Sequence, residues 1–174
     1  MSALHSLCPQ INIRIDDQGV AKMAGFASAA LSNIASEDDD LPVKPRWCSP
    51  EIIHPDAFGL TKAKATKASD MYAFGMLAYE VGSSSHVVPR PYSTCTQIFS
   101  GRIPFHDMHG AAVVIAVITT NERPPRPGHQ ELSDQLWKMI EKCWRMDPSQ
   151  RSTIQEAVAF LEDKDRNVNL QMYN

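Results

Sequence analysis

"ASDMYAFGMLAYEV", residues 68–81, is the stretch that decides the fold. If these residues form a helix, apolar side chains lie on almost every side of it, and no wide polar face remains for solvent. A helix that is apolar all round belongs in the interior of a domain. The run is too short to cross a bilayer, so we do not interpret it as a membrane span. We predict a buried helix at 69–81 with a mainly α domain packed around it.

The 174 residues are enough for one domain with a substantial core. With 43% hydrophobic residues, 21% charged residues and a net charge of −3, the composition is that of an ordinary globular protein. It favours neither a nucleic-acid surface nor a membrane surface, so we expect neither partner. The cysteines lack the Cys-x-x-Cys spacing of a zinc site and suit a reducing compartment; they are Cys8, Cys48, Cys95 and Cys143. No basic-then-apolar start follows Met1, so we expect a cytoplasmic protein.

Before the central helix, "INIRI" and "VAKMA" flank "DDQG" within residues 11–24. Two short β-rich runs joined by a turn that contains glycine predict a β-hairpin, with Asp16 and Asp17 as turn acids. Residues 25–49, which include the acidic "SEDDD" at 36–40, predict a loop. After the central helix, residues 82–97 have no periodicity, carry two prolines and are rich in Ser and Thr. We interpret them as a disordered insertion.

Three further helices are predicted towards the C-terminus. "VVIAVI" (113–118) begins a helix that "RPPRPG" (123–128) closes, because proline cannot continue a helix. Apolar residues at helical spacing predict a second helix within 132–144, with Ser133 as its N-cap. A third begins near two overlapping capping boxes, Ser152 with Gln155 and Thr153 with Glu156. On this last helix one face is apolar (Ile154, Val158 and Leu161), and we expect the polar tail beyond Asp163 to fray.

Five segments, in this order along the chain, resemble motifs in the C-terminal lobe of a protein kinase. Their sequences are most similar to those of the tyrosine-kinase-like group. They are "RWCSPEII" (46–53), "ASDMYAFGMLAYEV" (68–81), "GRIPFHDM" (101–108), "ERPPRP" (122–127) and "CWRMDPSQRSTIQEAV" (143–158). The resemblance covers nearly the whole chain apart from 82–97. It implies a partial kinase domain over 1–174, mainly α with a small β-hairpin, from which the N-terminal lobe is absent. The activity it implies is ATP-dependent phosphorylation of Ser, Thr or Tyr.

The resemblance also implies structural roles. Glu51, in a Ser-Pro-Glu variant of the family's Ala-Pro-Glu motif, would pair with Arg151, and Trp144 would pack beside the pair. Losing one partner of such a partly buried pair costs more than losing a surface pair. Asp70 matches the aspartate of the central helix that accepts hydrogen bonds from catalytic-loop amides. If the loop is shortened, Asp70 becomes a buried carboxylate without those donors.

The residues of the kinase chemistry are replaced. Kinases use a catalytic-loop aspartate as the base, a nearby asparagine as a metal ligand, and the aspartate of Asp-Phe-Gly to hold magnesium. When "VAKMAGFASA" (20–29) is aligned with that segment, Gly25 takes the place of the magnesium aspartate, Phe26 is the phenylalanine, and Ala27 replaces the glycine. Magnesium prefers carboxylate oxygen, which Gly25 does not have.

The catalytic loop can be aligned in two ways. Without a gap before Asn12, His5 is the motif histidine, Leu7 takes the place of the catalytic aspartate, and Pro9 that of the lysine. In the alternative, which we favour here, "ALHSLCPQI" (3–11) resembles the end of the preceding helix and about eight loop residues are missing after it. Neither alignment leaves an aspartate in the catalytic position. Asn12 is a vestigial metal ligand at most, and His5 fits a packing role better than that of a base.

We expect no cofactor, because the glycine-rich phosphate loop, the Val-Ala-x-Lys strand and the glutamate of the family's helix C have no counterparts here. ATP and magnesium are implied by the resemblance only. Three interpretations stay open: an inactive lobe that binds a protein partner, an active kinase, and a decayed or incompletely described kinase. The first is favoured if a shortened preceding helix leaves an apolar face of 69–81 exposed, because such a face invites a partner.

Overall fold

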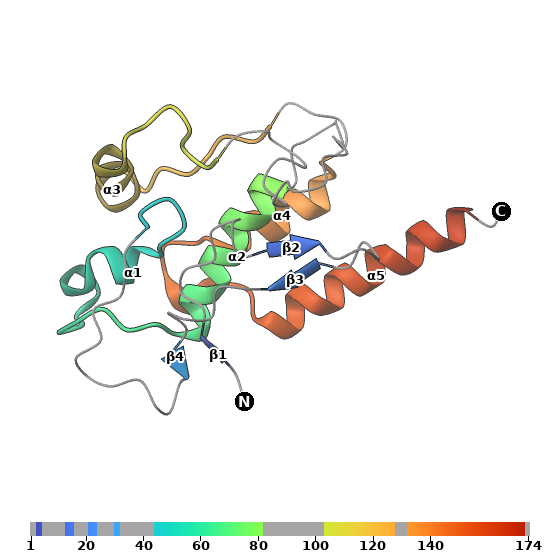
Figure 1. The fold of residues 1–174 in the computed structure, drawn as a ribbon, viewed down its shortest axis with the longest axis horizontal. Coiled ribbons are helices and arrows are strands. Elements are labelled where there is room, and N and C mark those ends of the chain that lie inside the picture. The colour runs from blue at the N-terminus through green and yellow to red at the C-terminus, as the bar shows by residue number, and fades with distance from the viewer. Residues whose placement is uncertain are drawn as a thin grey trace.

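The structure is a computed structural model that describes residues 3–4, 13–15, 21–23, 30–31, 44–81, 103–127 and 132–172. Its helices are α1 (Pro50–Ile53), α2 (Lys67–Val81), α3 (Gly110–Thr119), α4 (Asp134–Cys143) and α5 (Ile154–Met172) (Figure 1). Two 3₁₀ turns, η3 (Pro55–Phe58) and η4 (Pro148–Gln150), follow α1 and α4. The predicted mainly α fold is confirmed. The predicted insertion at 82–97 and the acidic run at 36–40 lie outside the described residues.

The centre of the domain is α2, which lies beside α4 (Figure 1). A Cβ added at Gly75 would lie 2.9 Å from the Cβ of Cys143, so the absence of a side chain lets the two helices approach closely. Side chains of α2 and α4 share one core with those of α3 and its preceding loop: Tyr72, Met76, Tyr79, Phe105, Val113, Val117, Leu132, Ile140 and Trp144. The predicted buried helix is therefore confirmed.

The expectation that α2 exposes an apolar face is wrong for residues 68–80. Every apolar side chain in this range is buried or half-buried. The exposed large hydrophobic residues that the structure describes lie elsewhere, three of them on one face of α5: Ile154, Val158 and Leu161, at 50%, 44% and 45% exposure. Among the described residues, Trp47 and Ile53 before α2 and side chains of α3 and α4 after it contribute to the packing around the central helix.

Two short antiparallel strand pairs precede the helices. In the first, β2 (Ile13–Ile15) pairs with β3 (Ala21–Met23), with Ile13 opposite Met23 and Ile15 opposite Ala21. This pairing confirms the predicted hairpin; its turn, with Asp16 and Asp17, lies outside the described residues.

The second pair joins β1 (Ala3–Leu4) to β4 (Ala30–Leu31). The interpretation of residues 3–11 as the end of a helix is wrong for Ala3 and Leu4, because they are extended and hydrogen-bond to a strand distant in sequence. Residues 5–12 lie outside the described residues, so both alignments of the catalytic loop stay open.

The helix ends differ in part from the predicted ones. The α3 helix begins at Gly110, before "VVIAVI", and ends at Thr119, where the N–H and hydroxyl of Thr120 both donate to the carbonyl of Ala116. The N-cap of α4 is Ser133, as predicted, and its hydroxyl accepts from the N–H of Leu136 at 3.2 Å. The prediction that the polar tail frays after Asp163 is wrong: the helix α5 continues to Met172.

Of the two overlapping capping boxes before α5, the structure forms one. The N–H of Thr153 donates to Oε2 of Glu156 at 2.9 Å, and the N–H of Glu156 donates to the Thr153 hydroxyl at 3.2 Å. Ser152 is buried instead, with its hydroxyl 3.5 Å from Sδ of Met139. A serine turned into the core cannot cap the helix, which explains the choice of box.

The loop before α3 is held by Arg46, a half-buried residue upstream of α1. Its guanidinium donates to the carbonyl of Pro104 at 2.9 Å, and to the carbonyls of Phe105 and Met108. Phe105 has a φ of 53°, an uncommon value for a bulky residue, and its side chain is buried in the core. Within the described part of the chain, no helix combines the length and apolarity needed to cross a membrane.

Candidate functional site

The lobe is tied together by a buried ion pair between α1 and the segment before α5. Nη1 and Nη2 of Arg151 donate to Oε1 and Oε2 of Glu51, each at 2.7 Å. Both residues are almost fully buried, at 5% and 3% exposure. A bidentate arginine–carboxylate pair fixes orientation as well as distance. The two residues paired by resemblance are thus brought together across most of the chain.

The remaining donors of Arg151 are also used. Nε donates to the carbonyl of Arg145 at 2.8 Å, Nη1 to that of Ala68 at 2.8 Å, and Nη2 to that of Met146 at 3.2 Å. Burying two charges is costly unless their hydrogen bonds are complete, and here the guanidinium is surrounded by acceptors. Arg151 therefore connects α1, the start of α2 and the turn after α4.

Tyr72 of α2 lies against two guanidinium groups. The central carbons of Arg123 and Arg151 lie 5.3 Å and 5.2 Å from the centre of its ring. These distances are within the range of cation–π attraction. Burial raises the pKa of Tyr72 to about 12, so its phenol stays neutral.

Trp144, the C-cap of α4, lies at the edge of this arrangement and is 3% exposed. Its ring contacts Trp137 edge-on at 5.6 Å and Tyr79 at 5.9 Å. Its carbonyl accepts from Nε of Arg123 at 2.9 Å. Trp144 thus joins the aromatic core to the segment that carries Arg123.

Sequence reasoning missed a second buried carboxylate, Glu80, near the end of α2. Its side chain is fully buried, and Oε2 accepts from the indole N–H of Trp47 at 3.3 Å. Oε1 has no hydrogen-bond partner among the residues that the structure describes. Burial raises the pKa of Glu80 to about 8, with the Trp47 hydrogen bond acting in the opposite direction. Glu80 is therefore mostly protonated at neutral pH, and no motif in the sequence signals this.

Asp70 lies in the first turn of α2 and is half-buried. Its N–H donates to the carbonyl of Thr66, and the same turn is capped by reciprocal hydrogen bonds between Thr66 and Ser69. The segment expected to donate to its carboxylate lies outside the described residues. The role of Asp70 therefore stays a prediction.

The positions of the kinase chemistry lie outside the described residues as well: His5, Leu7, Asn12, Gly25, Phe26 and Ala27. The strands that border them are described. Asn12 directly precedes β2 and Gly25 follows β3 by two residues, and the register places Ile13 opposite Met23. The strand ends nearest to these two positions are therefore adjacent.

The described cysteines have no reactive or metal-binding setting. Cys48 and Cys143 are buried free thiols, and burial raises the pKa of each to about 11. In the described ranges, no three His, Cys, Asp or Glu side chains come together in a way that could hold a metal ion.

Comparison with known proteins gives the family. Residues 3–161 match the sequence model of the family described as "Protein tyrosine and serine/threonine kinase". Among curated proteins, a probable serine/threonine-protein kinase of Dictyostelium discoideum is 29% identical over 174 residues, which cover 94% of this chain and 16% of that protein. The dual specificity protein kinase pyk3 of the same organism is 33% identical, covering 91% of this chain and 10% of pyk3. The serine/threonine/tyrosine-protein kinase HT1 of Arabidopsis thaliana is 27% identical, covering 88% of this chain and 33% of HT1.

The chain thus spans between a tenth and a third of the length of these relatives. The family match includes β1 and β4, the central helix α2 and both members of the Glu51–Arg151 pair. The mainly helical fold is that of a kinase C-terminal lobe, as the five motifs predicted. The chain belongs to the protein tyrosine and serine/threonine kinase family.

Proposed function

We propose that this chain is a kinase-family C-terminal lobe that does not transfer phosphate and acts instead as a protein-interaction module. The observation that carries the proposal is the residue type at two motif positions. In the ungapped alignment Leu7 stands where the family has its catalytic aspartate, and in the gapped alignment the loop with that aspartate is missing. In both, Gly25 stands where the family has its magnesium aspartate. Leucine cannot accept a proton from a substrate hydroxyl, and glycine has no side-chain oxygen for a metal.

The family implies ATP and magnesium. In kinases two magnesium ions neutralise the phosphates and are held by the Asp-Phe-Gly aspartate and the catalytic-loop asparagine. Of these two metal-binding residues this chain keeps only the asparagine, Asn12. Its amide oxygen alone does not make the set of hard oxygen ligands that magnesium needs. The residues at the motif positions therefore do not fit magnesium-bound ATP, and no catalytic step is assigned to them.

The described scaffold, in contrast, keeps its packing and its buried ion pair. The bidentate Glu51–Arg151 pair, the close contact at Gly75 and the core around Tyr72 need no residue of the phosphate chemistry. A lobe held in this way can present surfaces to another protein whether or not it catalyses a reaction. The exposed apolar face of α5 supports an interaction role, because grouped apolar side chains on a surface are typical of contact sites.

Two alternatives have distinct consequences. The relatives are named as kinases, which favours an active Ser/Thr or Tyr kinase; that function requires carboxylates supplied from outside the motif positions. A decayed or incompletely described kinase gene predicts a transcript that differs from this sequence around residues 11–12 and 82–97. Sequencing the transcript tests this second alternative. A continuous message that encodes the chain as given would exclude a decayed or incompletely described gene.

The proposal is tested by ATP binding and phosphate transfer. For the wild-type chain we expect no rise in melting temperature with magnesium and ATP, and no transfer of radiolabelled phosphate to a protein substrate. The double variant Leu7→Asp/Gly25→Asp restores both acids, and Leu7→Asn/Gly25→Asn is its uncharged control. A magnesium-dependent rise in melting temperature confined to the aspartate variant would show that these two positions are the site of the loss. Magnesium-dependent transfer by the wild-type chain, lost on heating, would refute the proposal.

A further inference from the structure

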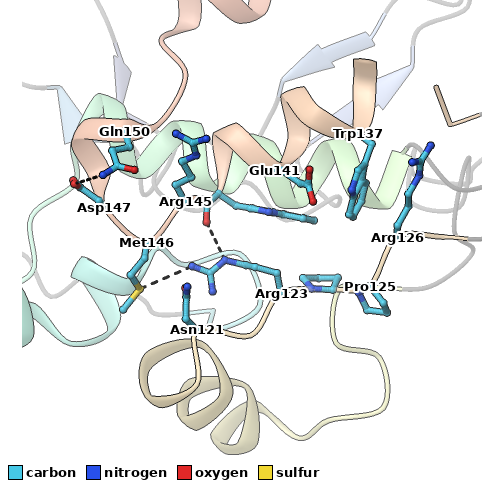
Figure 2. Close-up of a pocket in the computed structure, with 12 residues that line it drawn as sticks. Asn121, Arg123, Pro125, Arg126, Trp137, Glu141, Arg145, Met146, Asp147 and Gln150 are labelled. Carbon is cyan, nitrogen blue, oxygen red and sulfur yellow. Dashed lines mark hydrogen bonds between the residues drawn. The ribbon is translucent and has the colours of Figure 1, made fainter. Parts of the chain in front are cut away.

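A pocket of about 890 Å³ opens between the extended segment that follows α3 and the C-terminal end of α4 with its following turn (Figure 2). Its volume is in the range of ligand-binding pockets. Figure 2 shows two different ends: Asn121, Arg123 and Arg145 lie toward one, and Pro125 and Trp137 toward the other. Arg126, which is paired with Asp134, also lies toward the second end (Figure 2). The pocket thus has a cationic end around Arg123 and a second end, called the apolar end below, with the rigid apolar surfaces of Pro125 and Trp137.

Arg123 is the main feature of the cationic end. It is half-buried, and its guanidinium donates to the carbonyls of Trp144 and Glu122, at 2.9 Å and 2.7 Å, and to Sδ of Met146 at 3.9 Å. All three acceptors are neutral, and among the described residues no carboxylate forms an ion pair with Arg123. Arginine has five N–H donors, so donors remain for a ligand. Burial, and to a smaller extent the charge of Arg151, lowers the pKa of Arg123, as expected of a buried cation without a counter-ion.

The acids in the pocket do not supply that counter-ion. Asp147 accepts from the N–H and hydroxyl of Ser149, at 2.8 Å and 2.7 Å, and from the Gln150 amide at 3.1 Å. Its carboxylate is therefore used in hydrogen bonds within the turn that contains it. Glu141 lines the pocket from α4 but is exposed and makes no ion pair with Arg123. A nearby arginine shows the contrast, because Arg126 is already paired with Asp134 at 2.6 Å. Within the described ranges, the pocket charge without a paired carboxylate is therefore that of Arg123, and the exposed Arg145 adds to it.

The apolar end is built for a side chain or a short extended segment. Trp137 is half-buried and is fixed by its edge-on contact with Trp144, and Pro125 contributes a second rigid apolar surface. An indole held in place loses little conformational entropy when a ligand packs on it. A ligand that fills both ends needs an anionic group next to an apolar one.

We propose that this pocket binds a short segment of a partner protein in which a carboxylate or phosphate side chain is adjacent to an apolar residue. The anion contacts Arg123 and Asn121, and the apolar residue packs on Trp137 and Pro125. The inference rests on the proposed interaction role only in taking the partner to be a protein. Peptide binding and phosphate transfer are measured separately, so the failure of one is distinguishable from the failure of the other.

The test uses the indole N–H resonances of the tryptophans in ¹⁵N–¹H spectra of the full chain. The probes are blocked peptides Ala-X-Leu-Ala in which X is glutamate, phosphoserine or glutamine. We expect the Trp137 resonance to shift saturably with at least one anionic peptide, with affinity about tenfold or more above that of the glutamine peptide. The Trp47 indole donates to Glu80 and lines no part of the pocket, so its resonance serves as an internal reference. Response to glutamate or to phosphoserine identifies the anion.

Asn121→Asp is the variant that discriminates. Asn121 has a φ of 52°, which aspartate also tolerates, and Figure 2 shows its side chain beside Arg123. The new carboxylate would neutralise Arg123, so we expect the anionic peptide to bind about tenfold or more weakly while the Trp47 and Trp144 resonances keep their positions. Gln155→Glu adds the same charge on an exposed site of α5 and should leave binding unchanged. Equal binding of all three peptides, no shift at millimolar peptide, or full binding by Asn121→Asp would each overturn the inference.

Discussion

Replacing Glu80 with glutamine should remove a loss of stability that the wild-type chain suffers as the pH rises from about 5 to about 8. Glu80 is fully buried; one oxygen accepts from the Trp47 indole, and the other has no partner in the described part of the chain. In the unfolded chain its pKa has the ordinary value of 4.5, and in the folded chain burial raises that pKa to about 8. Between these values the folded state holds a proton that the unfolded state releases, so the free energy of unfolding falls with rising pH.

The size of the effect follows from the two pKa values. One pH unit corresponds to about 1.4 kcal/mol, so the full interval between 4.5 and about 8 amounts to at most about 5 kcal/mol. Glutamine remains neutral throughout and can still accept from Trp47. Its NH₂ group, buried without an acceptor, costs about 1–3 kcal/mol, but that cost does not depend on pH. The slope with pH, and not the absolute stability, is therefore the informative quantity.

The assay is urea unfolding followed by far-ultraviolet circular dichroism at one-unit steps from pH 5 to 9, which avoids relying on the fluorescence of Trp47. The stability difference between wild type and Glu80→Gln should change steadily up to about pH 8 and then level off. Glu141→Gln removes an exposed carboxylate on α4 and should run parallel to the wild type. If the curves of Glu80→Gln and the wild type are also parallel, Glu80 is ionised in the folded state and the reasoning from burial is refuted.

Three further substitutions test the packing of the lobe through their denaturation midpoints. Glu51→Gln leaves a buried guanidinium without its counter-charge and should destabilise by about 3–5 kcal/mol, whereas a loss below about 1 kcal/mol would mean that the pair behaves as a surface pair. Gly75→Ala places a Cβ 2.9 Å from that of Cys143, and the cost of about 1–3 kcal/mol should exceed the helix-propensity gain. Gly110→Ala is the control and should not destabilise, because the nearest atom to its added Cβ, Cγ of Pro45, lies at an ordinary contact distance of 3.9 Å. Thr153→Ala breaks one half of the α5 capping box and should cost about 1 kcal/mol; no change would assign the cap to another residue.

The central helix and the hairpin were predictable because their signals are local. A helix that is apolar on all sides, such as the one at 68–81, has to be buried in the interior of a domain. Two β-rich runs joined by a short turn with glycine pair with each other as a hairpin. The β1–β4 pair was not predictable, because two-residue strands have no period and their hydrogen bonds join residues distant in sequence. The same holds for Arg46, whose acceptors lie in a loop more than fifty residues away.

Contacts of the candidate site could be predicted from the sequence only where both interacting residues belong to motifs of the family. Glu51 and Arg151 could be paired on paper because each belongs to a motif, and the structure brings them together. Glu80 is an acidic residue within a buried helix. The neighbouring sequence does not indicate whether its side chain is exposed or is buried and protonated. The pocket around Arg123 depends on which acids have other partners, and sequence spacing does not contain that information.

The separation between scaffold and chemistry has a physical basis in this chain. The free energy that holds the lobe comes from the α2–α4 contact, the aromatic core and the buried Glu51–Arg151 pair. Leu7 and Gly25, the positions at which the proposed function takes metal and base functions to be lost, lie outside the described residues, whereas these contacts are all made by described residues. We expect aspartates at 7 and 25 to leave the cooperativity of unfolding intact, whereas Glu51→Gln should reduce stability. On the proposed function, a member of this family keeps its fold without the kinase chemistry, because different residues provide the two.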